Sequence, residues 1–300
     1  MIPFVPAPTF DYGRVDAVSP LIRRVIAANP GPFTFTGTGT YIVGRAVAGA
    51  GVAVIDPGPL DEAHLAALLA AVEGQTVSHV LVTHTHRDHA PLARPFAGRV
   101  GAPVLAAAPP ARTVHASAPL DEDDDADFAP DVVLTGGERI EGDGWTLEAL
   151  ATPGHASNHL GFALAEENAL FSGDHVMGWS TTVVAPPDGD MTAYMASLDA
   201  VIARGFSTLW PTHGGPIIEP GPFLEAYRAH RLGREAQILA RLAAGDRRIA
   251  DMVPALYAAV DARLWPAASL SVWAHLIALE RAGRVTAAPA PAMDADWTLD

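Results

Sequence analysis

Short apolar runs with strand character alternate with helical patterns along the first two thirds of the chain. Residues 39–56 read as two strands around a Gly/Ala turn, and residues 77–83 form a β-branched run typical of a buried strand. Between them, residues 61–72 place three leucines on one helical face. Further strands are predicted at 100–106, 145–150, 160–165, 169–172 and 208–210, and a helix at 192–204. This mixture predicts an α+β fold in which helices cover sheets.

The last third of the chain is mainly helical and predicts a second, smaller domain. Residues 216–222 are rich in proline and predict a linker, so we expect one domain at 1–218 and another at 219–300. Helices are predicted at 222–244, 249–257 and 270–282, and the Ala/Pro-rich segment after them is expected to fray as far as Trp297. The first of these helices has apolar positions that could pack on the other domain or form a homodimer: Phe223, Tyr227, Ile238 and Leu242.

Composition narrows the chemistry that the chain can perform. It contains no cysteine, which excludes disulfides and thiolate metal sites. All 19 basic residues are arginine, which excludes Schiff-base chemistry on a lysine. The net charge of −15 opposes general binding of nucleic acid and leaves room only for a local site. The acidic run within residues 117–131 is expected to be a solvated loop.

The chain shows neither of the usual sequence signals for membranes or export. It has no apolar run of about 18 residues, so we expect no membrane span. The N-terminus lacks a basic region followed by an apolar stretch, so we see no secretory signal. We therefore expect a cytoplasmic protein.

The strongest chemical signal comes directly after the strand predicted at 77–83. His84, His86, Asp88 and His89 lie within six residues, and imidazole and carboxylate are the ligands that zinc favours when no thiolate is offered. In an extended segment, His84 and His86 point to the same side, and a turn after them could bring Asp88 and His89 to a second position. Because one ion can rarely use four side chains from so short a stretch, the spacing indicates two metal ions.

Three later residues share the context of this motif. His155, Asp174 and His213 each follow a predicted strand, in the segments TPGH, SGD and PTHGG. Each has a glycine beside or near it, and glycine lets the backbone pass close to a metal cluster. We therefore predict that these three residues complete the metal site.

In this order, the motifs HTHRDH, TPGH, SGD and PTHGG resemble the metallo-β-lactamase superfamily, over about residues 36–218. The resemblance implies a four-layer αββα sandwich with the metal ions at one edge of its two sheets. It also implies that one zinc ion is held by His84, His86 and His155, and the other by Asp88, His89 and His213, with Asp174 bridging. The implied cofactors are two Zn²⁺ ions, although Mn²⁺ or Fe²⁺ could occupy the same ligands.

A closer resemblance covers nearly the whole chain. The segments GTGTYIVG, HTHRDHAPLA, PTHGGPI and HRLGREAQIL, together with the helical tail, are similar to the β-lactamase-like protein 2 family. This resemblance implies a small C-terminal winged-helix-like domain. Activities attributed to similar proteins include single-stranded RNA cleavage and thioester hydrolysis on carrier proteins, so the family narrows the fold more than the substrate.

The expected chemistry is hydrolysis by a hydroxide that bridges two zinc ions. Such ions lower the pKa of bound water from about 15.7 to about 7, and one of them polarises the bond under attack. Asp88 would orient the hydroxide, and with His155 and Asp174 it forms the set predicted to be catalytic, whereas Ser172 is predicted to be structural. We predict a hydrolase acting on a small-molecule or carrier-bound ester, thioester or related acyl substrate.

Alternatives to an acyl hydrolase stay open at this point. An endoribonuclease would need an arginine-lined groove, for which Arg87 and Arg94 are candidates. A β-lactamase or lactonase and an iron-dependent dioxygenase are compatible with the same ligands. A non-catalytic regulator could bind nucleic acid through the C-terminal domain, but nine arginines against ten acidic residues from residue 219 onward give that part a charge of only −1.

Other residues near the motifs are candidates for contact with substrate. Tyr194, His175 and His159 are predicted to bind it, and residues 178–190 have the length and Gly/Pro content of a loop that shapes the substrate pocket. The remaining histidines lack the context of ligands or are predicted to be structural: His64, His79, His115, His230 and His275.

Overall fold

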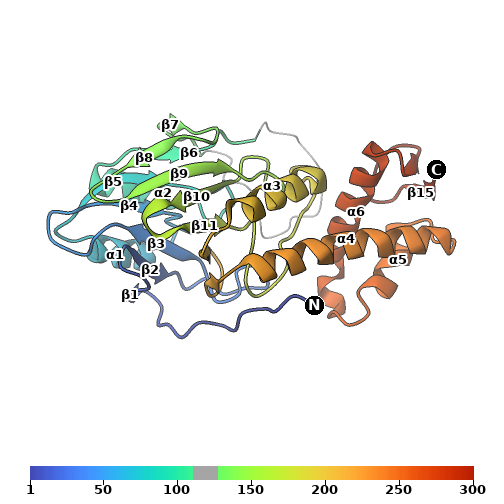
Figure 1. Cartoon of the computed structure of the whole chain (residues 1–300), viewed down its shortest axis with the longest axis horizontal. Coiled ribbons are helices and arrows are strands. Elements are labelled where there is room, and N and C mark those ends of the chain that lie inside the picture. Colours follow the sequence, from blue (N-terminus) through green and yellow to red (C-terminus); the bar gives the residue numbers. More distant parts are fainter. Residues whose placement is uncertain (111–127) are drawn as a thin grey trace.

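The structure is a computed structural model that describes residues 1–110 and 128–300 (Figure 1). Most of the predicted acidic loop, and His115 with it, lies outside the described residues. Two sheets stack in the larger part of the molecule, and helices from the last third of the chain form a smaller part beside them (Figure 1).

The first sheet has seven strands in the order in which they occur along the chain. They are β1 (Val15–Ala17), β2 (Ile22–Ile26), β3 (Gly39–Val43), β4 (Gly51–Ile55), β5 (Thr76–Leu81), β6 (Val104–Ala106) and β7 (Val132–Val133). The strands β1 to β4 pair antiparallel, and β4 to β7 pair parallel. Along β4, Val52 and Val54 face one core whereas Ala53 and Ile55 face the other. This alternation is that of a strand buried on both faces.

The second sheet has six strands, in the order β13-β12-β11-β10-β9-β8. They are β8 (Arg139–Glu141), β9 (Thr146–Ala151), β10 (Leu160–Leu164), β11 (Ala169–Gly173), β12 (Thr208–Pro211) and β13 (Ile217–Ile218). Only β11 and β12 pair parallel within it, joined by helix α3 (Met191–Arg204). The core between the sheets contains Tyr41 from the first sheet and Phe162 and Phe171 from the second, with Trp145 just before β9.

Helices cover the outer face of each sheet. On the first sheet, α1 (Glu62–Ala71) and α2 (Ala93–Val100) bury Leu68 and Phe96 against the strands. On the second sheet, α3 and the first part of α4 (Gly221–Ala243) bury Tyr194 and Tyr227. Helix α3 begins where the Asp190 side chain accepts hydrogen bonds from two backbone N–H groups of the first turn. The layers confirm the predicted αββα sandwich.

The C-terminal part consists of helices followed by a hairpin. It contains α5 (Ile249–Leu256), the short 3₁₀ helix η2 (Ala262–Leu264), α6 (Trp265–Arg281), β14 (Val285–Ala288) and β15 (Asp296–Leu299), and the two strands pair antiparallel. The prediction that the chain frays up to Trp297 is wrong, because β14 and β15 pair and Trp297 is fully buried among Met252, Val272 and Leu276. Helices followed by a two-stranded hairpin confirm the predicted winged-helix-like part.

Helix α4 belongs to both parts of the molecule. Its first half places Phe223 and Tyr227 in the core beneath α3, and its second half places Ile238 and Leu242 in the C-terminal core. The boundary at residue 219 therefore stays a prediction, because the helix that follows it crosses from one core to the other (Figure 1). Within the part of the chain that the structure describes, no helix is long and apolar enough to cross a bilayer.

Candidate metal centre

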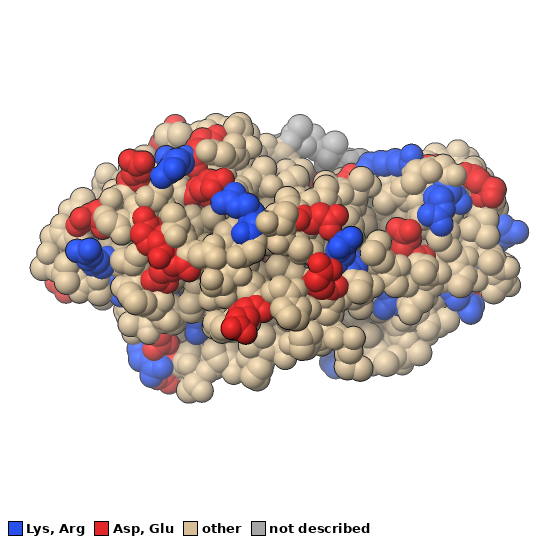
Figure 2. All heavy atoms as spheres, in the orientation of Figure 1, with Lys and Arg blue, Asp and Glu red and all other residues tan. Residues whose placement is uncertain are grey.

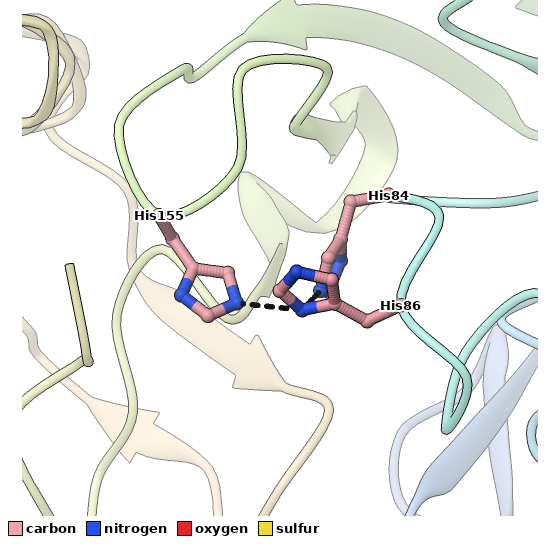
Figure 3. A group of neighbouring side chains, drawn as sticks. All are labelled: His84, His86 and His155. Carbon is pink, nitrogen blue, oxygen red and sulfur yellow. Dashed lines mark hydrogen bonds between the residues drawn. The ribbon is translucent and has the colours of Figure 1, made fainter. Parts of the chain in front are cut away.

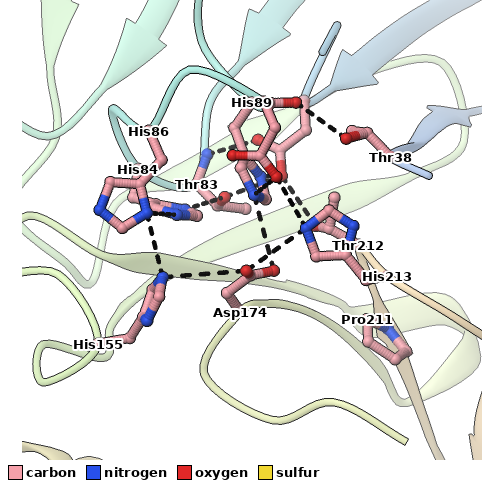
Figure 4. Close-up of polar contacts among 12 residues, drawn as sticks. Thr38, Thr83, His84, His86, His89, His155, Asp174, Pro211, Thr212 and His213 are labelled. Carbon is pink, nitrogen blue, oxygen red and sulfur yellow. Dashed lines mark hydrogen bonds and ion pairs between the residues drawn. The ribbon is translucent and has the colours of Figure 1, made fainter. Parts of the chain in front are cut away.

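The predicted ligands converge at one edge of the sandwich (Figure 4). The HTHRDH motif follows the carboxyl end of β5, His155 follows β9, Asp174 follows β11 and His213 follows β12. These strands end at the same edge, so segments far apart in the sequence meet there. The two sheets are also joined at this edge, because the backbone N–H of Gly39 donates a 2.8 Å hydrogen bond to the carbonyl of Thr212.

Three histidines form the first group of ligand atoms (Figure 3). Nδ1 of His86 lies 3.0 Å from Nε2 of His84 and 3.2 Å from Nε2 of His155. Burial and the neighbouring imidazoles hold the pKa of His84 well below its usual value and lower that of His86 to about 3. These two rings are therefore neutral at physiological pH, which is the form that binds a metal ion.

Asp88, His89 and His213 form a second group. Oδ2 of Asp88 lies 3.2 Å from Nε2 of His89 and 2.9 Å from Nε2 of His213. The Asp174 carboxylate lies between the two groups, 3.7 Å from Nε2 of His89, 3.5 Å from Nε2 of His213 and 3.9 Å from Nε2 of His155. This is the position that the predicted bridging residue would need.

Buried charges in the second group favour a cation. Burial raises the pKa of the Asp88 and Asp174 carboxyls, but His89 and His213 outweigh it and hold both pKa values below the usual range. Burial likewise opposes charge on the imidazoles, yet the two carboxylates raise the pKa of His213 to about 10 and that of His89 well above its usual value. The carboxylates are therefore ionised, and a cation between them would take the place of the imidazole protons.

Buried polar atoms that make no hydrogen bond show that these residues fit a metal. Nε2 of His89, Nε2 of His213 and Oδ1 of Asp174 are buried and make no hydrogen bond to any described residue. Such atoms are costly to leave unsatisfied. The ligand atoms lie within 4.8 Å of one another in the first group and in the second group. The same holds for a third set, which consists of His84, His89 and Asp174. Imidazole nitrogens and carboxylate oxygens at this spacing fit divalent metal binding.

Asp56, which directly follows β4, is a further residue of the centre that was not predicted. Its side chain is fully buried, and it accepts hydrogen bonds of 2.8 Å from both the backbone N–H and the hydroxyl of Thr83, and one of 3.0 Å from the hydroxyl of Thr212. Its Oδ2 also lies 2.9 Å from Nδ1 of His89. Asp56 has the same sequence context as His155, Asp174 and His213, namely a strand end with a glycine nearby, and this signal could have found it.

The three residues predicted to bind substrate are buried in the protein interior. His159 is buried, with Nδ1 2.7 Å from the Thr152 hydroxyl, and its Nε2 accepts a 3.1 Å hydrogen bond from the backbone N–H of Asp174. His175 and Tyr194 are fully buried, and the Tyr194 hydroxyl donates to the His175 carbonyl. Because burial leaves these three side chains no surface for a ligand, their predicted contact with substrate does not fit this structure.

The loop predicted at 178–190 contacts two of the candidate ligands. Nδ1 of His155 donates a 2.7 Å hydrogen bond to the Val183 carbonyl, and the Thr182 hydroxyl donates a 2.9 Å hydrogen bond to the Asp174 carbonyl. Helix α4 holds this loop in turn. The Tyr227 hydroxyl accepts from the backbone N–H of Thr182 and donates to the Ser180 carbonyl. Helix α4 therefore supports the loop that contacts the candidate ligands His155 and Asp174.

The arginine groove required by a ribonuclease finds little support. Arg87 is exposed, but Arg94 donates 2.8 Å hydrogen bonds to both carboxylate oxygens of Asp131. The face shown in Figure 2 carries arginine and acidic side chains interspersed over both parts of the molecule. Ser172 has the structural role predicted for it, because its hydroxyl donates to the Val176 carbonyl.

Comparisons with known families agree with this architecture. Residues 35–213 match the Metallo-beta-lactamase superfamily, and residues 249–297 match the beta-lactamase associated winged helix domain. The first match contains every candidate metal ligand, and the second contains α5, α6, β14 and the first two residues of β15.

Several curated proteins are similar to the chain. Lactamase-like protein adaB of Aspergillus niger is 33% identical over 233 residues, which are 76% of this chain and 66% of that protein. An atrochrysone carboxyl ACP thioesterase of Aspergillus chevalieri is 34% identical over 231 residues, 76% of this chain and 68% of that protein. A beta-lactamase-like protein 2 homolog of Drosophila melanogaster is 30% identical over 278 residues, 88% of this chain and 89% of that protein. The chain thus spans just under two thirds of the length of adaB.

A solved structure shares the fold of the whole chain. It is a metallo-beta-lactamase family protein from Thermus thermophilus, with a TM-score of 0.74 and 23% identity, and the match covers 95% of this chain and 100% of the other. The chain therefore belongs to the metallo-β-lactamase superfamily, among the relatives of β-lactamase-like protein 2 that carry a C-terminal winged-helix domain.

Proposed function

We propose that the chain is a dizinc hydrolase that cleaves an acyl thioester or a related ester. The observation that carries this proposal is the position of Asp174, whose carboxylate lies within 4 Å of imidazole nitrogens from both groups of ligands. A carboxylate between two sets of imidazoles suits a pair of cations better than a single one. The similarity to a protein named as an ACP thioesterase supports an acyl substrate, free or bound to a carrier.

The side chains of the centre have distinct tasks in this proposal. When bound, zinc ions would polarise the acyl carbonyl and lower the pKa of water to about 7. His84 and His86, held neutral, and His155 supply one set of nitrogens, and Asp174 lies between the sets. The Asp88 side chain is 19% exposed, more than the other six, so it lies where water and substrate arrive. Its ionised carboxylate can orient a water molecule.

The proposed reaction balances without a further reactant. The oxygen of water bonds to the acyl carbon, the bond from that carbon to sulfur or oxygen breaks, and the proton passes to the leaving thiolate or alkoxide. The products of thioester cleavage are a carboxylic acid and a free thiol. Because the chain contains no cysteine, a thiol reagent measures the product with no signal from the protein.

Metal analysis combined with thioester turnover tests the proposal. We expect two zinc ions per chain, and cleavage that a chelator abolishes and added zinc restores. Asp174→Asn should lower kcat, whereas Asp199→Asn should not, because Asp199 is exposed and pairs only with Arg228 among the described residues. Zinc-loaded protein that cleaves no thioester or ester would overturn the substrate class, and iron in protein purified without added metal would overturn the choice of zinc.

A further inference from the structure

A cavity of about 590 Å³ lies between the sandwich and the C-terminal helices. Its walls come from the N-terminal residues, the segment around Phe33, the loop from Trp179 to Val183, helix α4, and the region from Tyr257 to Ser271. The size falls within the range of about 300–1,000 Å³ that is usual for sites of small molecules. The C-terminal part of the chain thus forms one wall of a ligand-sized space.

Two residues that line the cavity, Val183 and Trp179, connect it with the metal centre, although no candidate ligand lines it directly. Val183, which lines it, accepts the hydrogen bond from the imidazole of His155. Trp179 also lines it and packs against Gly214, the neighbour of His213, so closely that a Cβ on this glycine would lie 3.0 Å from the Trp179 ring. The ring of Phe35 stacks on Trp179 with 4.6 Å between centroids. The wall of the cavity is therefore continuous with residues that contact or adjoin a ligand from each metal group.

The lining suits an uncharged, apolar group. It is formed largely by apolar side chains such as Ile2, Phe4, Leu264 and Ala267. The arginines in the wall are engaged with the protein. Arg231 donates to the Thr182 carbonyl and lies 4.9 Å from the centroid of the Tyr194 ring.

A second arginine and a histidine also line the wall. Arg234 donates to the Leu256 carbonyl and lies 4.1 Å from the centroid of the Tyr257 ring. Burial lowers the pKa of His230 to about 4, so its ring is neutral. An apolar occupant would gain from such a space, because burial of apolar surface is favourable and most of the lining side chains are apolar.

We propose that this cavity binds the apolar acyl group of the substrate, so that helix α4 and the winged-helix part that follows it set acyl preference. The proposal rests on the proposed function, because it places the acyl chain beside a centre that cleaves the bond at its carbonyl end. Fatty acyl chains and fused aromatic acyl groups share the required chemistry, and the arms of the experiment below distinguish them.

The test uses small-to-large substitutions on one exposed helix face. Ala229 lines the cavity on α4, and Ala236 lies two turns further along the same helix, exposed and outside the cavity. Acetyl, decanoyl and naphthoyl thioesters of N-acetylcysteamine are compared as substrates. We expect kcat/KM to be roughly tenfold or more higher for at least one large acyl group than for acetyl. Ala229→Trp should reduce that ratio severalfold, and Ala236→Trp should leave it unchanged.

A binding measurement separates this proposal from the proposed function. The decyl and naphthylmethyl thioethers of N-acetylcysteamine cannot be hydrolysed, and calorimetry measures their binding to chelator-treated protein and to both variants. If the thioethers bind and Ala229→Trp weakens this binding, the cavity proposal is supported. This holds even if no thioester is cleaved, and in that case only the proposed function fails. The cavity proposal would be overturned if thioesters are cleaved with no preference for large acyl groups and Ala229→Trp leaves thioether binding unchanged. The proposed hydrolase function would then still stand. Thermal unfolding checks that both variants fold.

Discussion

Oδ2 of Asp56 lies 2.9 Å from Nδ1 of His89, and both side chains are fully buried. Nδ1–H of His89 donates to Asp56, and Nε2 of the same ring faces Asp88 and Asp174. Asp56 accepts from Thr83 and Thr212 as well, so its own orientation is fixed by both sheets. A carboxylate in this position sets the orientation and tautomer of an imidazole ligand.

We therefore predict that Asp56→Asn weakens binding at the second group of ligands and leaves the first intact. The expected loss is about 10–100-fold in affinity for one of two zinc ions, as for other residues that orient a metal ligand. Zinc titration against a competing chelator measures both sites, and Asp199→Asn serves as an exposed control. Two affinities equal to those of the parent protein would show that Asp56 does not orient His89.

Removal of metal should destabilise the folded chain. Without a cation, the ionised carboxylates of Asp88 and Asp174 and the buried nitrogens of His89 and His213 stay imperfectly paired. A ligand that binds only the folded state adds about 2.7 kcal/mol of stability at a concentration 100 times its Kd. We expect a chelator to lower Tm and zinc to restore it. The same Tm in chelator and in zinc would contradict a metal site at these residues.

The Tyr227 hydroxyl connects helix α4 with the loop that contacts His155 and Asp174. It accepts from the backbone N–H of Thr182 and donates to the Ser180 carbonyl, in a fully buried position. Tyr227→Phe leaves the buried Thr182 N–H without this acceptor, which costs about 1–3 kcal/mol in unfolding free energy. Denaturant unfolding measures this loss.

The same variant should lower kcat, because the loop that it loosens holds two candidate ligands. Tyr12→Phe provides the control, since Tyr12 is exposed and makes no side-chain hydrogen bond that links it to this loop. Equal unfolding free energies for the two variants would mean that the Tyr227 hydroxyl does not hold the loop.

Acid should destabilise the chain partly through His64. This ring is buried, with Nε2 2.9 Å from the Thr40 hydroxyl, and burial lowers its pKa from 6.5 to about 4. The unfolded chain therefore binds a proton at this residue at higher pH than the folded chain does. The stability contributed by the neutral ring is present above pH 6.5 and is lost as the pH falls from 6.5 towards 4.

His64→Gln removes this titration. We expect the variant to be less stable at pH 7, and the difference in unfolding free energy from the parent to shrink by up to about 1.4 kcal/mol per pH unit in that window. Denaturant unfolding at several pH values, with the metal content held constant, measures the difference. A difference in unfolding free energy between parent and variant that stays constant from pH 7 to pH 4 would rule out the protonation of His64 as a source of acid sensitivity.

Much of the candidate site could be predicted from the sequence because its signal is local. His84, His86, Asp88 and His89 lie within one turn-forming segment, and His155, Asp174 and His213 each follow an apolar strand. Strand ends of this kind are recognisable from residue pattern alone. The family resemblance carried by these motifs implied the αββα sandwich, and the helical patterns after residue 219 predicted the helical C-terminal part.

Contacts between distant segments needed the tertiary structure. Asp56 lies far from His89 in the sequence, and only the parallel pairing of β4 with β5 brings the ends of these strands together. His159, His175 and Tyr194 looked like substrate contacts because they lie near the motifs, but all three are buried, Tyr194 in the core between α3 and the second sheet. The hairpin around Trp297 was missed for a similar reason, since its stability comes from a core built by other helices.

The chain's own residues thus determined which groups could hold metal ions, because ligand chemistry depends on residue type and on short spacing. The tertiary structure decided how those groups are oriented and what space lies beside them. The cavity next to the centre is formed by the N-terminus, two segments of the sandwich, helix α4 and the region from Tyr257 to Ser271, which no local pattern relates to one another. Pairing of strands and packing of side chains are non-local, and for that reason substrate shape is read from the fold and not from the motifs.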